Sequence, residues 1–247
     1  MALAIVSTTR AEPPRVSTTS ALAFGELLRA VPVAVAGAAL SGLISSVFYA
    51  LVPMWMQGKD IDSATIGLVM LAAVLGGLAF QIPVGHLSDR VDRRIVLAGL
   101  CVGLAAAALA LVHLPRSLLV ILPVVALFGG FISTLYPICV AHAHDIMPAD
   151  RVVPVSGQLI LLSGVGSVLG PLIGMSLKQS YGIDGIFYLI VGAAILLAVI
   201  AAGRSLTSAL PSHLIRPFEM LAPQVLVVAH EPPIAREQQS PKRHGPS

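Results

Sequence analysis

Six long apolar stretches, separated by short polar segments, dominate the pattern of hydrophobic and polar residues along the chain. They cover about 31–54, 64–84, 95–112, 117–139, 155–175 and 186–202. At about 1.5 Å of rise per residue, roughly 17 to 24 helical residues cross a hydrocarbon layer about 30 Å thick. A membrane-barrel strand shows only about ten alternating residues. The pattern therefore predicts six transmembrane helices, of which the sixth is the shortest.

The charged residues support this prediction. Only 11% of the chain is charged and 56% is hydrophobic, whereas a soluble domain carries roughly 25% charged residues. Every Asp, Glu, Lys and Arg lies outside the six stretches, and a charge at a helix centre costs about 2.5–3.5 kcal/mol on insertion. The predicted fold class is therefore an all-α membrane protein.

The basic residues also predict how the chain is oriented. One side of the membrane receives both tails and the loops after the second and fourth stretches. Its basic residues are Arg10, Arg15, Arg29, Arg90, Arg93, Arg94, Arg151, Arg204, Arg216, Arg236, Lys242 and Arg243. The other side receives only Lys59, Arg116 and Lys178. The positive-inside rule then predicts a multi-pass membrane protein with both termini in the cytoplasm. Because these charges form no single patch, the net charge of +3 does not indicate a nucleic-acid partner.

Three regions follow from this pattern. Residues 1–28 are a polar leader, residues 29–203 are the six-helix membrane domain, and residues 204–247 are a Pro-rich tail. The tail's longest apolar run, Val225–Val228, is too short to span a membrane, so the tail is expected to be cytoplasmic and either disordered or loosely associated with the membrane surface.

The polar segment after the second stretch carries the most specific motif. It reads Gly85-His-Leu-Ser-Asp89-Arg90-Val-Asp92-Arg93-Arg94. This segment resembles the signature of the major facilitator superfamily of transporters, Gly-x-Leu-x-Asp-Arg-x-Gly-Arg-Arg/Lys. The matching residues are Gly85, Leu87, Asp89, Arg90, Arg93 and Arg94. Asp92 replaces the second Gly, which puts the usual turn of this loop in question.

The resemblance implies that this segment is a cytoplasmic gate whose Asp89 and Arg90 take part in a conformational switch. Gly85 would allow a tight turn and close approach of a helix. Asp89 could accept hydrogen bonds at a helix N-terminus, and the arginines could pair with carboxylates on neighbouring helices. The alternative is that Arg93 and Arg94 serve membrane topology alone.

The fifth stretch contains a second motif, Gly166-Ser-Val-Leu-Gly170-Pro171-Leu-Ile-Gly174. It resembles the Gly-rich segment Gly-x-x-x-Gly-Pro-x-x-Gly-Gly of the same family, with Met175 in place of the last Gly. Three glycines four residues apart share one helix face and allow close packing, and Pro171 can bend the helix. Such a helix suits rocking motion, although packing of small residues without motion explains the pattern equally well.

The resemblance covers about residues 25–203 and implies one half of the fold, because whole members have twelve spans in two halves. The leader Arg10–Ala30 resembles the linker between halves, and the Pro-rich end resembles a C-terminal tail. The segments Gln81–Gly85 and Tyr136–Asp145 resemble second-half segments of bacterial drug- or sugar-transporter-like members. The chain is therefore interpreted as the C-terminal six-helix half.

Uncharged polar residues inside the stretches are the candidates for contact with a solute. In this family the first and fourth spans of a half line the central cavity, which favours Tyr49 and Tyr136. Gln81 and Gln158 lie on the second and fifth spans. The alternative role for all four is hydrogen bonding between helices, worth about 0.6–2 kcal/mol.

No cofactor, metal or catalytic site is expected. Cys101 and Cys139 lie in apolar stretches and are interpreted as small buried hydrophobic residues. His142 and His144 lack the partners of a metal site and are interpreted as part of an interfacial loop. A membrane enzyme would need a nucleophile with a base, but Ser163 and Ser167 have no such partner in their span.

The leading functional hypothesis is a half-length carrier that moves a small organic solute across the inner membrane by alternating access. It would act with a second copy of itself or with a separately encoded first half. The alternative is a truncated fragment that does not transport, or a membrane interaction subunit. Because no ionisable group lies at membrane depth, any ion-coupling residue must sit in the missing half, or transport is uncoupled.

Overall fold

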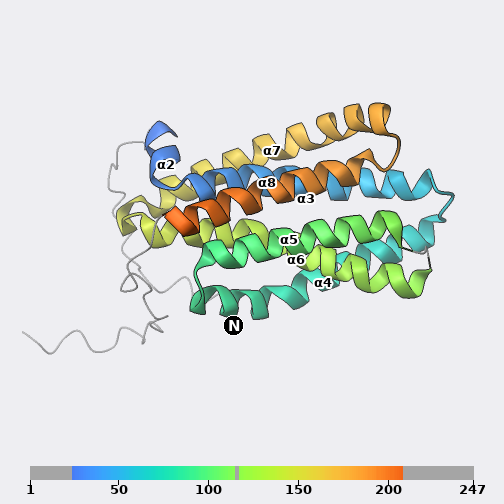
Figure 1. Cartoon of the computed structure of the whole chain (residues 1–247), viewed down its shortest axis with the longest axis horizontal. Helices are drawn as coiled ribbons and strands as arrows, with labels where there is room; N and C mark the ends of the chain where they lie inside the picture. Colours follow the sequence, from blue (N-terminus) through green and yellow to red (C-terminus); the bar gives the residue numbers. More distant parts are fainter. Residues whose placement is uncertain (1–23, 115–116, 208–247) are drawn as a thin grey trace, which may run out of the picture. The chain divides into compact units, whose positions relative to one another are not determined.

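The computed structural model of the chain describes residues 24–114 and 117–207, which form helices and short connections without a strand (Figure 1). In chain order the elements are α2 (Phe24–Ala30), α3 (Pro32–Gln57), α4 (Ser63–Arg90), α5 (Arg93–His113), α6 (Leu118–Ile146), the 3-10 turn η1 (Ala149–Arg151), α7 (Val152–Tyr181) and α8 (Gly185–Thr207). The six helices α3 to α8 are long and apolar enough to cross a membrane. The predicted all-α membrane protein with six transmembrane helices is confirmed.

The helices extend beyond the apolar stretches. The fourth stretch ended near Cys139 in the sequence, whereas α6 continues to Ile146, and α8 continues through Arg204 to Thr207. Charged residues at a helix end can reach water, so the helix need not end where the hydrocarbon does. As a result α5, with 21 residues, is shorter than α8, with 23. The expectation that the sixth span is the shortest is wrong.

Local capping explains where several helices begin and end. The Asp62 carboxylate accepts a hydrogen bond from the backbone nitrogen of Thr65 at 3.0 Å and caps α4. Side-chain and backbone hydrogen bonds from Thr65 hold the pKa of Asp62 below its usual value. Pro32 occupies the first turn of α3, where its missing N–H costs nothing. Gly182, with φ of 76°, ends α7 in a backbone conformation that favours glycine.

The six long helices form two repeats of three. The first repeat is α3, α4 and α5, and the second is α6, α7 and α8. The closest helix pairs are α3 with α7 and α4 with α6, while α5 packs on α8. If the two repeats are exchanged, so that α3 and α6, α4 and α7, and α5 and α8 change places, the same three pairs result. Because three is an odd number of crossings, the second repeat runs through the membrane in the opposite sense, which is the inverted-repeat arrangement of many transporter folds.

Close contact between α4 and α6 depends on one glycine from each helix. A Cβ atom at Gly76 of α4 would collide with the carbonyl oxygen of Ala126 in α6. A Cβ atom at Gly129 of α6 would collide with the carbonyl oxygen of Ala73 in α4. The two backbones therefore approach as small residues allow in membrane helices.

The α3–α7 pair repeats this contact in the same register. A Cβ atom at Gly42 of α3 would collide with the carbonyl oxygen of Ser163 in α7. A Cβ atom at Gly166 of α7 would collide with the carbonyl oxygen of Ala39 in α3. In all four helices the glycine lies three positions after the residue whose carbonyl oxygen faces the glycine of the partner helix. This shared spacing supports the assignment of two inverted repeats.

Two apolar clusters fill the space between the helices. The larger cluster includes the rings of Phe48 and Phe128, whose planes are tilted by 36° and whose centroids lie 4.8 Å apart. The smaller cluster lies where α2 meets α3, α6 and α7, and it buries Leu27 of α2 completely. The predicted boundary between leader and membrane domain at residues 28 and 29 falls inside α2. The rest of the leader, and residues 208–247 of the predicted tail, lie outside the described residues.

Candidate functional site

The signature segment is almost entirely helical. Gly85, Leu87, Asp89 and Arg90 belong to the last turns of α4, and Arg93 opens α5, so only Val91 and Asp92 lie between the helices. The interpretation of this segment as a loop is therefore wrong. A Cβ atom at Gly85 would meet no other atom within 4 Å, so this glycine serves neither a turn nor a close helix contact.

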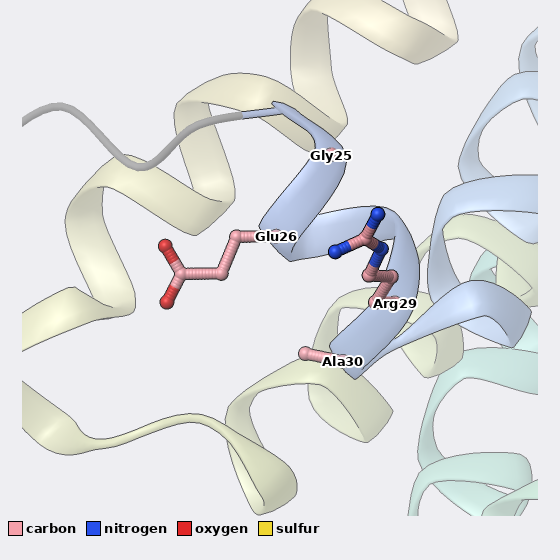
Figure 2. A pocket seen from close by; sticks show the side chains of 4 residues that line it. All are labelled: Gly25, Glu26, Arg29 and Ala30. Carbon is pink, nitrogen blue, oxygen red and sulfur yellow. The ribbon is translucent and has the colours of Figure 1, made fainter.

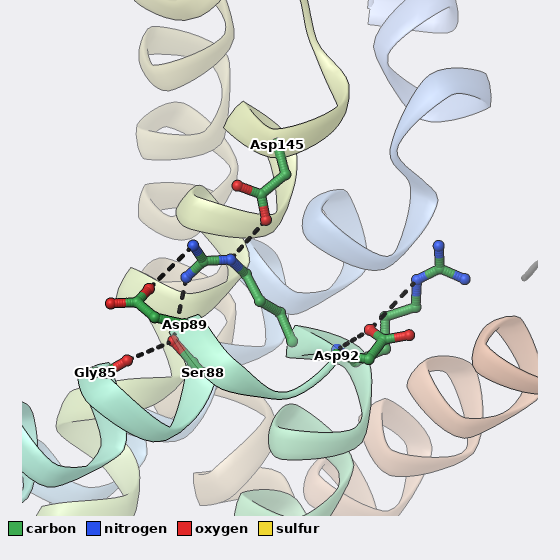
Figure 3. A network of polar contacts seen from close by, with 7 residues as sticks. Gly85, Ser88, Asp89, Asp92 and Asp145 are labelled. Atoms are coloured by element: carbon green, nitrogen blue, oxygen red, sulfur yellow. Dashed lines mark hydrogen bonds and ion pairs between the residues drawn. The ribbon is translucent and has the colours of Figure 1, made fainter. Parts of the chain in front are cut away.

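Arg93 is the centre of the polar network at this end of the bundle, and Figure 3 labels its partners Ser88, Asp89 and Asp145. Its Nε donates to Asp145 of α6 at 2.6 Å, and one terminal nitrogen donates to Asp89 of α4 at 3.2 Å. Asp89 and Asp145 thus face each other across one guanidinium group. The Arg93 side chain is 20% exposed, whereas those of Asp89 and Asp145 are 52% and 43% exposed. One arginine therefore ties the α4–α5 corner to the end of α6.

Ser88 supports the same guanidinium group, and the sequence did not single it out. The Ser88 hydroxyl accepts a hydrogen bond from Arg93 at 3.1 Å and donates one to the carbonyl oxygen of Gly85. Ser88 is only 4% exposed. The sequence feature that could have indicated Ser88 is its position next to Asp89 and one helical turn before Asp92. Asp145 was considered only with the histidines, because its pairing with Arg93 requires the fold.

Arg90 lies apart from this network. Its side chain is exposed at the end of α4, and it makes no hydrogen bond or ion pair with the residues that the structure describes. The family resemblance had placed the switch role on Asp89 and Arg90. The geometry gives the bridging contact to Arg93 instead, while Asp89 remains one of its two carboxylate partners.

Asp92 gives the α4–α5 corner a different construction from the family signature. Its backbone φ of −51° is open to any residue, so the usual glycine is not needed here. The Asp92 carboxylate accepts a hydrogen bond from the backbone nitrogen of Arg94 at 2.9 Å and caps α5. The Arg94 side chain is buried and donates to the carbonyl oxygen of Arg204 in α8 at 2.7 Å. Arg93 therefore binds the end of α6, whereas Arg94 binds the end of α8.

We expect Asp92→Ala to destabilise the protein by about 1 kcal/mol because the cap of α5 is lost. For a chain of this size the melting temperature in detergent would fall by about 3 °C. Asp92→Asn is the matched control, since an amide oxygen can still cap the helix and should keep most of the stability. Equal melting temperatures for Asp92→Ala and the unaltered chain would contradict the capping role.

A cleft of about 380 Å³ opens beside the Arg93 network, between α4 and α6. It is lined by Gln81, Val84, Gly85, Ser88, Asp89, Arg93, Thr134, Pro137, Ile138 and Ala141. Of the four polar candidates for solute contact, the lining includes only Gln81. The cleft lining includes Ser88, Asp89 and Arg93, which are members of the network. The cleft and the network therefore form one candidate site.

The other three polar candidates lie elsewhere in the bundle. Tyr49 is 47% exposed on α3, with its ring edge-on to Phe48 at 5.0 Å. Tyr136 packs against the smaller apolar cluster, and Gln158 is half-buried on α7. None of these three side chains lines the cleft that Gln81 lines. Solute contact by Tyr49, Tyr136 and Gln158 stays a prediction.

The Gly-rich segment of α7 faces α3, as its spacing predicts. Gly166, Gly170 and Gly174 are buried, and Cβ atoms there would meet Ala39, Leu43 and Leu51 of α3 respectively. Pro171 lies inside α7, which runs without interruption from Val152 to Tyr181. The close packing is therefore present in the structure, while motion of this helix stays a prediction.

The histidine segment is helical, so its interpretation as an interfacial loop is wrong. His142 and His144 lie in the last turns of α6. His142 is 4% exposed, and a ring nitrogen of His144 lies 2.8 Å from the Ser156 hydroxyl of α7. Across the described residues, no group of three or more His, Cys, Asp or Glu side chains is arranged to hold a metal ion.

A second, more open hollow lies against α2, where Gly25, Glu26, Arg29 and Ala30 line it (Figure 2). All four residues come from one short helix, and all four are exposed. Glu26 instead accepts a hydrogen bond from Arg151, at the start of α7, at 2.5 Å. This ion pair fixes α2 across the end of the bundle that also holds Arg93, and sequence analysis did not predict it.

The comparisons with known proteins agree with the fold and the motif. The Major Facilitator Superfamily model matches residues 34–237. Similar curated proteins include the "Uncharacterized MFS-type transporter YcaD" of Salmonella arizonae, which is 30% identical over 174 residues, 67% of this chain and 42% of the relative. The proteins of that name in Escherichia fergusonii and Shigella flexneri are each 29% identical over 66% of this chain and 42% of their own length. No solved structure matches.

The six apolar helices in two inverted repeats define an all-α integral membrane protein with a transporter-type fold. The chain belongs to the major facilitator superfamily. It spans less than half the length of the curated relatives that it matches. The family match points to a transporter rather than an enzyme.

Proposed function

We propose that this chain is a six-helix unit of a carrier that moves a small organic solute across the inner membrane by alternating access. The observation that carries the proposal is the bridge from Arg93 to Asp89 and Asp145, which joins the α4–α5 corner to the end of α6. The three side chains are partly exposed, so water can replace their contacts at modest cost. Such a network can form and break during a conformational cycle, as a gate requires.

The charge distribution supports a cytoplasmic position for the Arg93 end. Of the described residues, Arg29, Arg90, Arg93, Arg94, Arg151 and Arg204 gather at this end, while Lys59 and Lys178 lie at the other. Short loops with an excess of Lys and Arg remain in the cytoplasm. This orientation places both ends of the six-helix unit on the cytoplasmic side.

The solute is proposed to be small and organic, and its recognition to depend on uncharged groups. The six spans carry their charged residues near the helix ends and none at mid-depth. Tyr49, Gln81, Tyr136 and Gln158 provide hydroxyl and amide groups along the spans. A proton-coupled carrier usually needs a carboxylate or histidine inside the membrane, so a coupling residue would have to come from a partner unit.

Transport also requires a second six-helix unit, because alternating access depends on one bundle moving against another. The partner is either a second copy of this chain or a first half that is encoded separately. The resemblance of the leader, the tail and the segments near Gln81 and Tyr136 to second-half segments favours the separate first half.

Flux measurements in proteoliposomes test the proposal. The chain, alone and together with a candidate first half, should move members of a panel of small organic solutes faster than empty vesicles do. Asp89→Asn should impair that flux without reducing membrane insertion, because it removes one of the two charges that Arg93 bridges. Flux that never exceeds that of empty vesicles would contradict the carrier, and full flux in Asp89→Asn would contradict the gate.

A second candidate is a membrane interaction subunit, or a fragment, that does not transport. The observation that favours it is that this chain matches only 42% of the length of these relatives. It predicts stable insertion and binding to a partner with no flux in any combination, which the same vesicles measure.

A further inference from the structure

A second polar cluster lies at the end of the bundle opposite Arg93. The indole nitrogen of Trp55 donates to the Asp184 carboxylate at 2.6 Å. The Lys59 ammonium lies 3.5 Å from the same oxygen and 5.8 Å from the centroid of the Trp55 ring. Trp55 is 6% exposed, so its N–H group has little access to water and needs this partner.

The place of this cluster in the two repeats mirrors that of the Arg93 network. Trp55 belongs to the end of α3, the first helix of repeat one, and Asp184 directly precedes α8, the last helix of repeat two. Arg93 opens α5, the last helix of repeat one, and Asp145 belongs to the end of α6, the first helix of repeat two. In both clusters the start of a third helix is joined to the end of the other repeat's first helix.

The signs of the charges are exchanged between the two ends. At the Arg93 end the base opens the third helix and the acid ends the first helix. At the Trp55 end the acid, Asp184, precedes the third helix and the base, Lys59, follows the first. The chemistry therefore differs while the position is shared, so a search for repeated residues would not reveal the relationship.

Apolar contacts reinforce the cluster. The rings of Trp55 and Phe187 meet edge-on with centroids 5.0 Å apart. A Cβ atom at Gly58 would collide with the side chain of Ile183, so the α7–α8 connection lies directly on the end of α3. Polar and apolar contacts here act between the same two segments.

We propose that Trp55, Lys59 and Asp184 form a clamp between the two repeats, which holds the end of α3 to the start of α8. This clamp keeps the repeats joined at the end of the bundle opposite the Arg93 network. The clamp is a property of the six-helix unit. Only its consequence, that the repeats stay joined at this end while the Arg93 network breaks during transport, depends on the proposed function.

Trp55 is the only tryptophan of the chain, so its fluorescence reports on this clamp without labelling. Quenching by acrylamide is measured on the purified full chain in detergent. Asp184→Ala should raise the quenching constant about twofold or more, because the end of α3 opens locally to water. Gln179→Ala, at an exposed position near the end of α7, is the matched control and should leave quenching unchanged. Arg93→Gln, at the far end, should also leave it unchanged.

Disulfide formation between cysteines introduced at Gly58 and Ile183 provides a second readout. The pair should crosslink readily in the parent chain and several-fold more slowly with Asp184→Ala, which opens the contact between the repeats. If Asp184→Ala does not fold, Asp184→Asn decides, because it keeps an acceptor for the indole but loses the Lys59 charge pair. Slower crosslinking in the folded variant supports the clamp. Unchanged crosslinking or quenching would overturn it, and neither result depends on transport.

Discussion

Gly166→Val is expected to lower the stability of the protein more than any other single change considered for α7. A Cβ atom at Gly166 collides with the backbone carbonyl of Ala39. Because this is a backbone atom, no change of side-chain rotamer in α3 can relieve the collision. Overpacking of this kind costs about 3 kcal/mol, which corresponds to a fall of about 10 °C in melting temperature for a chain of this size. Thermal unfolding in detergent, followed by circular dichroism, measures the change. Gly166→Ala should show a smaller effect in the same direction.

Gly164→Val is the matched control for this prediction. Gly164 lies half a turn away on the same helix, and a Cβ atom there would meet no atom within 4 Å. Valine is a slightly better helix former than glycine, so this variant should be neutral or marginally more stable. Similar melting temperatures for the two valine variants would show that α3 and α7 are not packed through Gly166.

The apolar pattern predicted the fold well because lipid imposes a strict rule on spanning segments. Each stretch had to be helical and long enough to cross the bilayer, and six such helices are present. The ends were less accessible to prediction. A helix that leaves the hydrocarbon is no longer constrained by hydropathy, so the helical states of His142 and His144 could not be read from their polarity.

The signature segment predicted the location of the site but not which arginine bridges it. Arg90 and Arg93 both match the family pattern, and both lie within a turn of Asp89 or Asp92. The choice depends on where α6 ends, because Asp145 approaches from that helix. This is tertiary information that no local spacing contains. The contact of Glu26 with Arg151 depends in the same way on residues far apart in the chain.

Glycine spacing proved more informative than the isolated polar residues. Four-residue spacing fixes the face of a helix that Gly166, Gly170 and Gly174 share, and that face meets α3. A single Tyr or Gln within an apolar run carries no such constraint. Its direction depends on the rotation of its helix against its neighbours, which explains why Gln81 lines the cleft beside Arg93 and Tyr49 does not.

Arg93→Gln is the second change with a large expected effect. It removes the positive charge between Asp89 and Asp145 and leaves two carboxylates facing each other. Each contact is partly exposed, so each contributes about 1 kcal/mol or less, and the loss of both should lower stability by about 1–2 kcal/mol. The measurement is again thermal unfolding of the purified chain. Arg90→Gln, three residues earlier and exposed, should change stability by no more than about 0.5 kcal/mol.

A double-mutant cycle with Asp145→Asn separates the bridge from other effects of Arg93. The coupling between Arg93 and Asp145 should exceed that between Arg93 and Asp89, because the first contact is 2.6 Å long and the second 3.2 Å. Both couplings should weaken as salt is added, since these side chains are reached by solvent. If Arg93→Gln matched Arg90→Gln in stability, and the cycle gave no coupling, the bridge could not tie α6 to the α4–α5 corner. The gate would then have to rest on residues outside this network.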